Sequence, residues 1–363
     1  MSAPRPPAGT TAATPAGSPA RTKTARAAAR AAVSPDWRPC APLAHLQARA
    51  ALLRDLREFF ADRGVLEVET PILSRAAATD PALASLHTDC LLDAAAAQTL
   101  YLHTSPEFPM KRLLAAGSGP IYQVCKVFRG GERGRRHHPE FSLLEWYRPG
   151  WSLECLMDEV AALVRCLLRR PNLASTRLTY RDLFLDHLDL DPWATSAAAL
   201  GAHAHALGLV GVADQLDLDR DGWLDLLLTQ CLEPGLGRDA TTGRPHLTFL
   251  CDYPPSQAAL ARIRPGPVPV AARFELYLDG MELANGFEEL TDADEQRARF
   301  AADLAVRARA GQPLVPPDEG LLGALAAGLP ACAGVALGLD RLLMLVTAAA
   351  HIDAVLAFPV ERA

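Results

Sequence analysis

The chain has 363 residues, of which 50% are hydrophobic and 21% charged, so it is long and apolar enough to bury a large core. No stretch of about 18 uninterrupted apolar residues occurs, so the sequence predicts no membrane-spanning helix. The formal net charge is −6, and an acidic chain is not expected to carry a broad nucleic-acid surface. Only three of the 36 basic residues are lysines, so a run of arginines reflects overall composition more than function.

Residues 1–42 are expected to form a disordered tail rich in alanine, proline and arginine. The first 35 residues contain five basic side chains, no acidic one and neither Trp nor Phe. Such a segment cannot bury enough apolar surface to offset the entropy of ordering it. An organelle transit peptide has a similar composition, and this alternative stays open, whereas a secretory signal would need an apolar segment. We therefore expect the folded domain at residues 43–363.

The cysteines and the pair His203 and His205 give no sign of a metal site. Eight cysteines are scattered along the chain without a Cys-x-x-Cys pair. This spacing indicates neither a zinc site nor a disulfide framework, so we expect reduced thiols in a cytoplasmic protein. His203 and His205 have no other ligand nearby in the sequence and are expected on a helix surface.

The spacing of apolar residues predicts helices and strands in a mixed order. Apolar residues at helical spacing predict a helix over 46–63, and alternation predicts a strand over 65–69 that ends at Thr70-Pro71. The other predicted strands are 100–102, 121–128, 141–147, 248–251, 272–278 and 281–284. The other predicted helices are 110–114, 153–168, 293–310 and one from 340, and 175–245 is expected to be mostly helical. Hairpins rather than regular βαβ units favour an α+β fold with a mainly antiparallel sheet flanked by helices.

The densest polar segment is the loop after the strand predicted at 121–128. It begins at Arg129 and continues with Gly130, Gly131 and Glu132 towards His137. An arginine at a strand end beside glycines can hold a phosphate with its planar guanidinium. An exposed loop in an arginine-rich chain is the alternative.

A second segment carries three glutamates. Glu275, Glu282 and Glu289 are spaced seven apart, and a turn at Asp279-Gly280 would fold the first back towards the second. Two carboxylates beside a phosphate site are typical ligands of Mg²⁺. The third can bind a cationic group of a substrate. Acids on an exposed strand are the alternative.

A third segment, GVALGLDR at 334–341, leads into an apolar helix. Its small residues permit close approach of a ligand, and Arg341 at a helix start can meet a phosphate. By itself this pattern is weakly specific, and it is not the GxGxxG fingerprint of a dinucleotide site.

Together these segments resemble motifs 2 and 3 of class II aminoacyl-tRNA synthetases, and residues 46–71 resemble motif 1, the dimer-forming element of that family. RHHPEF (136–141), LLEWY (143–147) and ELANGFEEL (282–290) are similar to segments of lysyl-tRNA synthetases. The resemblance runs from residue 46 to the C terminus and implies the catalytic domain of that family, acting as a homodimer.

Lysyl-tRNA synthetases carry an anticodon-binding domain before motif 1, for which residues 1–45 leave no room. The chain is therefore more similar to the paralogues that lysylate translation elongation factor P, as FFADRGVLEVETP (59–71), HTSPE (103–107) and GVALGLDRL (334–342) indicate. This resemblance implies an ATP-dependent, AMP-forming ligase. It would activate (R)-β-lysine or lysine as an acyl-adenylate and transfer it to the ε-amine of a lysine on elongation factor P. No tRNA and no membrane partner is expected, and Arg133, Arg135 and Arg136 are candidates for contacting an acidic partner.

The resemblance also assigns the nucleotide site, residue by residue. Arg129 matches the catalytic arginine that holds the α-phosphate, and Arg341 matches the one that holds the γ-phosphate. Glu275 and Glu282 match the acids that bind Mg²⁺. The remaining expected ATP contacts are Gly130, Gly131, Glu132, His137, His138, Leu283, Gly338 and Phe141, the last stacking on adenine.

The substrate pocket is assigned in the same way. Glu289 and Tyr147 match the residues that receive the side-chain ammonium of lysine, and Ser105, Pro106 and Glu107 match the segment that holds its amino group. Lysyl-tRNA synthetases generally have alanine in place of Ser105 and glycine in place of Ala336. A hydroxyl and a methyl gained in one pocket would shift the position of the substrate's amino group, which fits a preference for (R)-β-lysine.

Two positions depart from the family pattern. Gly131 stands where the family has a glutamate that reads adenine, and the acid here is one residue later, at Glu132; we expect the loop to shift by one residue. His138 stands where the family commonly has asparagine. Two alternatives stay open: a lysyl-tRNA synthetase that charges tRNA, and a catalytically silent regulatory module with the same fold, for which Gly131 is the only support.

Overall fold

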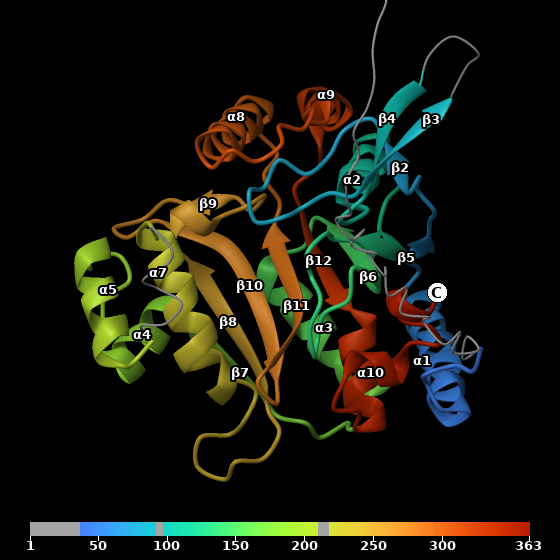
Figure 1. The fold of residues 1–363 in the computed structure, drawn as a ribbon, viewed down its shortest axis with the longest axis horizontal. Coiled ribbons are helices and arrows are strands. Elements are labelled where there is room, and N and C mark those ends of the chain that lie inside the picture. The colour runs from blue at the N-terminus through green and yellow to red at the C-terminus, as the bar shows by residue number, and fades with distance from the viewer. Residues whose placement is uncertain (1–36, 92–96, 210–217) are drawn as a thin grey trace, which may run out of the picture. The chain divides into compact units, whose positions relative to one another are not determined.

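The computed structural model describes residues 37–91, 97–209 and 218–363 (Figure 1). Most of the predicted tail therefore lies outside the described residues. Arg38–Ala363 forms one compact unit. The backbone N–H groups of Cys40 and Ala41 donate to the carbonyls of Ala357 and Leu356, at 2.8 and 3.1 Å. The folded unit thus begins a few residues before the boundary predicted at residue 43.

A nine-stranded sheet forms the centre of the described unit. Its order is β1 (Leu66–Glu67), β5 (Ile121–Phe128), β6 (Glu140–Pro149), β12 (Cys332–Gly338), β11 (Met281–Glu288), β10 (Val270–Leu278), β8 (Leu247–Tyr253) and β7 (Ser175–Thr179), with β9 (Ile263–Arg264) beside β10. The pairs β1–β5 and β7–β8 are parallel, whereas every other pair in it is antiparallel. A smaller sheet has the order β2 (Leu73–Ser74), β4 (Ala97–Leu102) and β3 (His87–Leu91). The predicted mainly antiparallel sheet is confirmed.

Strand alternation separates a core face from a polar face of the large sheet. Leu144 and Trp146 of β6 are fully buried in the main hydrophobic cluster, which also contains side chains of α1 (Leu43–Ala61), α3 (Leu153–Leu167) and α10 (Leu339–Thr347). Because successive side chains of a strand point to opposite faces, Glu145 and Tyr147 face the other way. Figure 1 shows α3 behind the sheet and α1 and α10 at one of its ends.

The register aligns residues of four neighbouring strands in one row across that second face, three of them polar and the fourth Ala336. Glu145 of β6 pairs with Ala336 of β12, Ala336 pairs with Asn285 of β11, and Asn285 pairs with Glu275 of β10. Directly paired residues project to the same side of a sheet. The fold thereby brings together residues that are far apart in the sequence.

Two further groups of helices border this face. Helices α2 (Glu107–Ala115), α8 (Ala293–Arg309) and α9 (Glu319–Gly328) share a hydrophobic cluster. Helices α4 (Tyr180–Leu188), α5 (Ala197–Ala206) and α7 (Arg220–Leu227) pack with β8 and β10 in another, on the left of the sheet in Figure 1, across from α1. The Asp292 side chain caps α8 by accepting from the N–H groups of Asp294 and Glu295, both at 2.9 Å, which fixes where this helix begins.

The remaining described helices are a π-helix at Leu228–Leu232 and 3-10 turns at Glu233–Gly235, Pro255–Gln257, Ile352–Val355 and Val360–Arg362. The segment 175–245, predicted as mostly helical, contains α4, α5, α7 and the π-helix but starts with strand β7, and its residues 210–217 lie outside the described part. The sequence patterns missed α9, β2, β3, β9 and β12. In the described part of the chain, the structure contains no helix long and apolar enough to cross a membrane.

Candidate active site

A cavity of about 1500 Å³ lies over the polar row of the sheet. Six of the predicted site residues line it, and all six were assigned to the substrate pocket or the first phosphate contact: Ser105, Glu107, Arg129, Tyr147, Glu289 and Ala336. Glu145, Asn285 and Gly334 line it as well. The structure therefore gathers the predicted substrate residues around one space, although they come from α2, β6, β12 and the chain next to β11.

Two carboxylates at the wall of this cavity share one buried ammonium. Nζ of Lys111 lies 2.5 Å from Oε1 of Glu107 and 2.6 Å from Oε2 of Glu289. Lys111 and Glu107 are four residues apart on α2, so their side chains lie on the same face of the helix. The side chains of Lys111 and Glu289 are both about 1% exposed, which makes this an ion pair out of contact with solvent.

A third carboxylate, Glu145, lies in the same pocket. The Ser105 hydroxyl donates to its Oε2, and the Tyr147 hydroxyl donates to its Oε1, both at 2.6 Å. The Ser105 oxygen also accepts from the N–H of Glu107, at 3.0 Å. Ser105 thus ties the start of α2 to strand β6.

Burial of so many acids in one place shifts their pKa values. Burial raises the pKa of Glu145, and the charge of Glu107 adds to the rise, while hydrogen bonds from Ser105 and Tyr147 oppose it. Burial also raises the pKa of Glu289, against the opposing charge of Lys111. Burial alone would lower the pKa of Lys111, but the carboxylates of Glu107 and Glu289 outweigh it, so the net shift is upwards. An empty pocket therefore keeps Lys111 charged and favours retention of a proton on one of its carboxyl groups.

Gly334 leaves the space in which a substrate side chain can end. A Cβ atom at this position would lie 2.4 Å from Oε1 of Glu289 and 2.4 Å from ring carbons of Tyr147. Any larger residue would therefore push apart the two groups predicted to receive the substrate's side-chain ammonium. This glycine belongs to the predicted small-residue segment 334–341, where close approach was the expected reason for its size.

Arg129, the predicted α-phosphate ligand, lies where the β5–β6 loop starts. Its guanidinium lies over the Phe141 ring, 5.1 Å from the centroid, and Nε donates to the carbonyl of Thr104 at 3.4 Å. Nη1 is 3.9 Å from Oε1 of Glu132. The aromatic predicted to stack on adenine thus already carries a cation on one side.

Arg341, the predicted γ-phosphate ligand, lies in the first turn of α10 and reaches the hairpin of β10 and β11. Nη1 donates to the carbonyl oxygen and to Oε2 of Glu282, at 2.8 and 2.9 Å, and Nη2 donates to Nε2 of His137 at 2.6 Å. Burial and the charge of Arg341 lower the pKa of His137, so the neutral ring is the acceptor. The structure thereby brings together Arg341, Glu282 and His137 from the three predicted segments.

The loop conformation explains one departure from the family pattern. Gly131 has φ of +79°, in the left-handed region that disfavours residues with a Cβ atom. Glu132 follows it, within reach of Arg129 and close enough to act on the pKa of His137. This geometry agrees with the expected shift of the loop by one residue.

The two acids predicted to bind Mg²⁺ both have partners. Glu282 holds Arg341, while Glu275 accepts from Arg273 and from the hydroxyl of Tyr277, whose oxygen also lies 3.0 Å from Oε1 of Glu233. No three His, Cys, Asp or Glu side chains among the described residues converge as a metal cage. The donor chemistry fits an ion that arrives with nucleotide phosphates, because Mg²⁺ takes one or two carboxylates and completes its shell with phosphate and water oxygens.

The family of the chain follows from comparisons with known proteins. The family described as tRNA synthetases class II (D, K and N) matches residues 36–362. The chain belongs to the class II tRNA synthetases. It is 50% identical over 328 residues to a protein of Yersinia enterocolitica named elongation factor P--(R)-beta-lysine ligase, covering 90% of this chain and 98% of that protein. Proteins of the same name from Pectobacterium carotovorum and Yersinia pestis are 49% and 50% identical over the same coverage. The predicted fold class, family and ligase class are confirmed.

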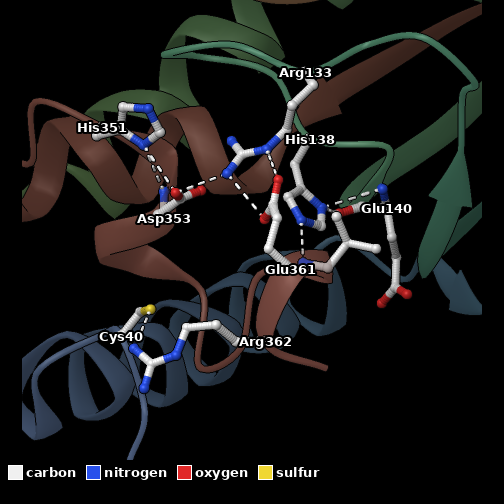
Figure 2. Close-up of polar contacts among 9 residues, drawn as sticks. Cys40, Arg133, His138, Glu140, His351, Asp353, Glu361 and Arg362 are labelled. Carbon is white, nitrogen blue, oxygen red and sulfur yellow. Dashed lines mark hydrogen bonds and ion pairs between the residues drawn. The ribbon is translucent and has the colours of Figure 1, made fainter. Parts of the chain in front are cut away.

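In this class II synthetase the C-terminal residues hold the motif 2 loop, residues 129–140. Arg133 binds Glu361 through Nε at 2.7 Å and Asp353 through Nη2 at 2.9 Å. The N–H of Val360 donates to Nε2 of His138 at 2.9 Å, and Nδ1 of that ring lies 2.6 Å from the carbonyl oxygen of Glu140. Figure 2 shows these contacts together.

This arrangement changes three sequence-based assignments. His138 is buried against the C-terminal turn and lies apart from the cluster around Arg341, so its ring is not positioned as an ATP contact. The side chain of Leu283 is buried in the main hydrophobic cluster, which leaves only its backbone for a nucleotide. Arg133 is engaged by Glu361 and Asp353, and Arg136 donates to the carbonyl of Gly280, so neither points freely towards an acidic partner.

The other predicted contacts are backbone positions. Pro106 stands at the N-cap position of α2 and Gly338 at the N-cap position of α10. Neither forms a side-chain hydrogen bond to its helix. The N–H of Gly130 donates to the carbonyl of Ala84 at 2.7 Å, which fixes the loop against the segment before β3. These residues shape the site through their backbone and lack of bulk.

Sequence reasoning missed three residues that line the cavity, Glu145, Arg273 and Asn285, and it missed Lys111, which lies behind the lining carboxylates of Glu107 and Glu289. Glu145 and Asn285 stand inside the quoted segments LLEWY and ELANGFEEL, but neither was given a role. Lys111 carried two signals: it is one of only three lysines in an arginine-rich chain, and it lies four residues after Glu107. Arg273 is half-buried between the carbonyl of Gln257, at 2.8 Å, and Glu275.

Proposed function

We propose that the chain activates (R)-β-lysine, or lysine, with ATP and transfers the lysyl group to a lysine of translation elongation factor P. The observation that carries this proposal is the convergence of Ser105 and Ala336 on Glu145. Ser105 donates to Glu145 and Ala336 pairs with it across the strands, and both positions depart from lysyl-tRNA synthetases. The relatives named elongation factor P--(R)-beta-lysine ligase support the same acceptor and the same isomer.

The first step joins the substrate carboxylate to the α-phosphorus of ATP and releases pyrophosphate. Glu289, Tyr147, Glu107 and Glu145 hold the two ammonium groups, so the carboxylate points towards Arg129. Arg129 and Arg341 stabilise the negative charge that develops on the phosphates, and a protein nucleophile is not needed. Exchange of Arg341 from Glu282 to a phosphate would occur when ATP binds.

The second step forms an amide. The ε-amine of the acceptor lysine attacks the carbonyl carbon of the acyl-adenylate, the bond from that carbon to the phosphate oxygen breaks, and AMP leaves. The attacking nitrogen must lose a proton to become an amide. Among the arginines predicted to face an acceptor, Arg135 has an exposed side chain, while its carbonyl accepts from Ile352 at 2.9 Å. We therefore place the acceptor near the tip of the motif 2 loop.

Magnesium, dimerisation and location complete the proposal. Glu282 and Glu275 would hold Mg²⁺, which neutralises phosphate charge when it is bound. The homodimer is proposed from the motif 1 resemblance of α1 and the strand after it, and equilibrium sedimentation tests it. Because all eight cysteines are free in the structure, we also propose a reducing, cytoplasmic location.

The deciding experiment is intact-mass analysis of elongation factor P after incubation with the protein, ATP, Mg²⁺ and (R)-β-lysine. We expect a mass increase of one lysyl group, and no increase with the Arg129→Ala variant. A tRNA for lysine in a parallel reaction tests the synthetase alternative. Pyrophosphate exchange without any acceptor tests the silent-module alternative. An unchanged mass with the wild-type protein would defeat the proposal.

The isomer preference has its own test. The double variant Ser105→Ala, Ala336→Gly restores the residues of lysyl-tRNA synthetases around Glu145. We expect the ratio of kcat/KM for (R)-β-lysine to that for α-lysine to fall at least tenfold, because each added group shapes the position of the amino group. An unchanged ratio would contradict the role given to these two residues.

A further inference from the structure

Lys111 is a buried charged residue that the proposed chemistry does not use. Its side chain is about 1% exposed, and its ammonium lies 2.5 Å from Glu107 and 2.6 Å from Glu289. A lysine side chain costs free energy to bury, so such a group persists only where its charge is compensated. Its location between the two acids predicted to hold opposite ends of the substrate points to a role beyond packing.

Lys111 engages one oxygen of Glu289 and leaves the other towards the substrate space. The ion pair uses Oε2. The other oxygen, Oε1, lies beside Gly334: a Cβ atom added at Gly334 would be 2.4 Å from Oε1 and 2.4 Å from ring carbons of Tyr147. The carboxylate is therefore held in a fixed orientation with one free oxygen beside Gly334. Without this ion pair, Glu289 and Glu107 would repel each other and could turn away.

The charges in the pocket can be counted from the named residues. Three carboxylates (Glu107, Glu145 and Glu289) face Lys111, and the other polar groups against them are the neutral Ser105, Tyr147 and Cys332. When all three carboxyl groups are ionised, one ammonium leaves two negative charges without compensation. A diamino acid brings two ammonium groups, which balance these two negative charges, while its own carboxylate points towards Arg129.

We propose that Lys111 is a positioning residue that sets the pocket's charge to match a substrate with two ammonium groups and holds Glu289 with one oxygen open. This inference rests on the proposed lysine activation and names the property of the substrate that the pocket selects. A substrate with a single ammonium leaves one carboxylate uncompensated in a pocket where Glu145 and Glu289 are buried. Discrimination against such analogues follows from the cost of that buried charge.

The test compares Lys111→Met, which keeps the length of the side chain and removes the charge, with Lys111→Arg, which keeps the charge. Lys126→Met is the matched control, because Lys126 is 43% exposed and lies 3.5 Å from Glu140. Pyrophosphate exchange gives KM for lysine, KM for ATP and kcat over a range of pH. Calorimetry of lysine binding without ATP gives the number of protons released, independently of any catalysis.

In Lys111→Met we expect KM for lysine to rise at least tenfold while KM for ATP stays within twofold. As pH rises and the carboxyl groups of the pocket ionise, KM for lysine should fall and then level off. In Lys111→Met the pH at which it levels off should move up by about one unit, since one pKa unit corresponds to a factor of ten. Lys111→Arg should recover most of the pH profile, and Lys126→Met should match the wild type.

A Lys111→Met variant that loses kcat and both KM values alike, with an unchanged pH profile, would assign Lys111 a purely structural role and overturn the inference. If Lys111→Met does not fold, Lys111→Arg decides the question, because this variant keeps the charge. A tenfold rise in KM for lysine and a shifted pH profile in Lys111→Arg would overturn the inference. Failure of the proposed function is distinguishable, because wild-type protein would then give no exchange while calorimetry still measures diamine binding. Wild-type protein that binds no diamine at all would overturn both.

Discussion

Arg341 donates through one nitrogen to both the carbonyl oxygen and the carboxylate of Glu282, at 2.8 and 2.9 Å. The start of α10 is thereby fastened to the β10–β11 hairpin before any nucleotide binds. Both residues were predicted to contact ATP or its metal, and here they neutralise each other. Under the proposed phosphate role of Arg341, ATP binding separates this pair, with phosphate replacing Glu282 at the arginine.

Removal of Arg341 should therefore affect catalysis more than folding. For Arg341→Ala we expect kcat in pyrophosphate exchange to fall about 10²–10³-fold, the range found when one charge-stabilising donor is removed from a transition state. The side chain is 21% exposed and its partners are polar, so thermal stability should change little. Arg297→Ala, which removes an exposed ion pair with Glu319, is the control. A loss of less than tenfold would contradict the phosphate role of Arg341.

Gly131 offers a test of the loop shift. Gly131→Glu restores the family's residue at its usual position, but φ of +79° makes any side chain strained there by about 1–2 kcal/mol, although the space around it is open. We expect this variant to be less stable and to have a higher KM for ATP. Glu132→Gln should also raise KM for ATP without loss of stability. Higher activity in Gly131→Glu would show that the loop adopts the unshifted conformation.

The sheet and most residues of the candidate substrate pocket could be predicted from the sequence, because the patterns that indicate them are local. The alternation in β5, β6, β10 and β11 and the periodicity in α1, α3 and α8 are visible within short windows, and the structure contains all of them. Helix α9 was missed because its sequence, EGLLGALAAG, has three glycines and its apolar residues span only two helical turns. Strand β12 reads as small residues, and only its place between β6 and β11 makes it a strand.

The sequence could not predict the side-chain contacts that depend on strand register or on where the C-terminal turn lies. The convergence of Ser105, Ala336 and Glu145 depends on strand pairing between residues almost 200 positions apart. The ion pair between Lys111 and Glu289 joins α2 to the end of β11, and nothing within either segment specifies it. His138 was placed with the nucleotide by its neighbour His137, whereas the Val360 N–H determines where its ring lies.

The raised pKa values of the pocket predict how stability depends on pH. Burial raises the pKa of Glu145 to about 7, so the protonated form is favoured in the folded, empty protein. The stability that this proton provides is fully present below the ordinary carboxyl pKa and is lost as pH rises through the raised value. We expect the melting temperature of the empty protein to fall between about pH 5 and pH 8, and lysine to restore more of it at the higher pH.

Glu145→Gln, which resembles the protonated form, isolates this contribution. Its melting temperature should decline less over the same range, while Glu58→Gln, at an exposed site, should follow the wild type. Differential scanning calorimetry at several pH values, with and without lysine, measures both effects. Parallel curves for Glu145→Gln and the wild type would mean that another group carries the pH dependence.

The contact between His138 and the C-terminal turn should hold the motif 2 loop in place. His138 is 4% exposed, and its Nε2 accepts from the Val360 N–H at 2.9 Å (Figure 2). His138→Ala leaves that donor without its acceptor, and we expect a loss of about 1–3 kcal/mol in the free energy of unfolding. KM for ATP should rise as well, because Arg129, Glu132 and His137 lie on the same loop. Glu361→Gln, which weakens only an exposed ion pair, should change both far less. Denaturant unfolding and pyrophosphate exchange measure the two effects, and an unchanged KM for ATP in a destabilised His138→Ala protein would show that the C-terminal turn stabilises the fold without positioning the loop.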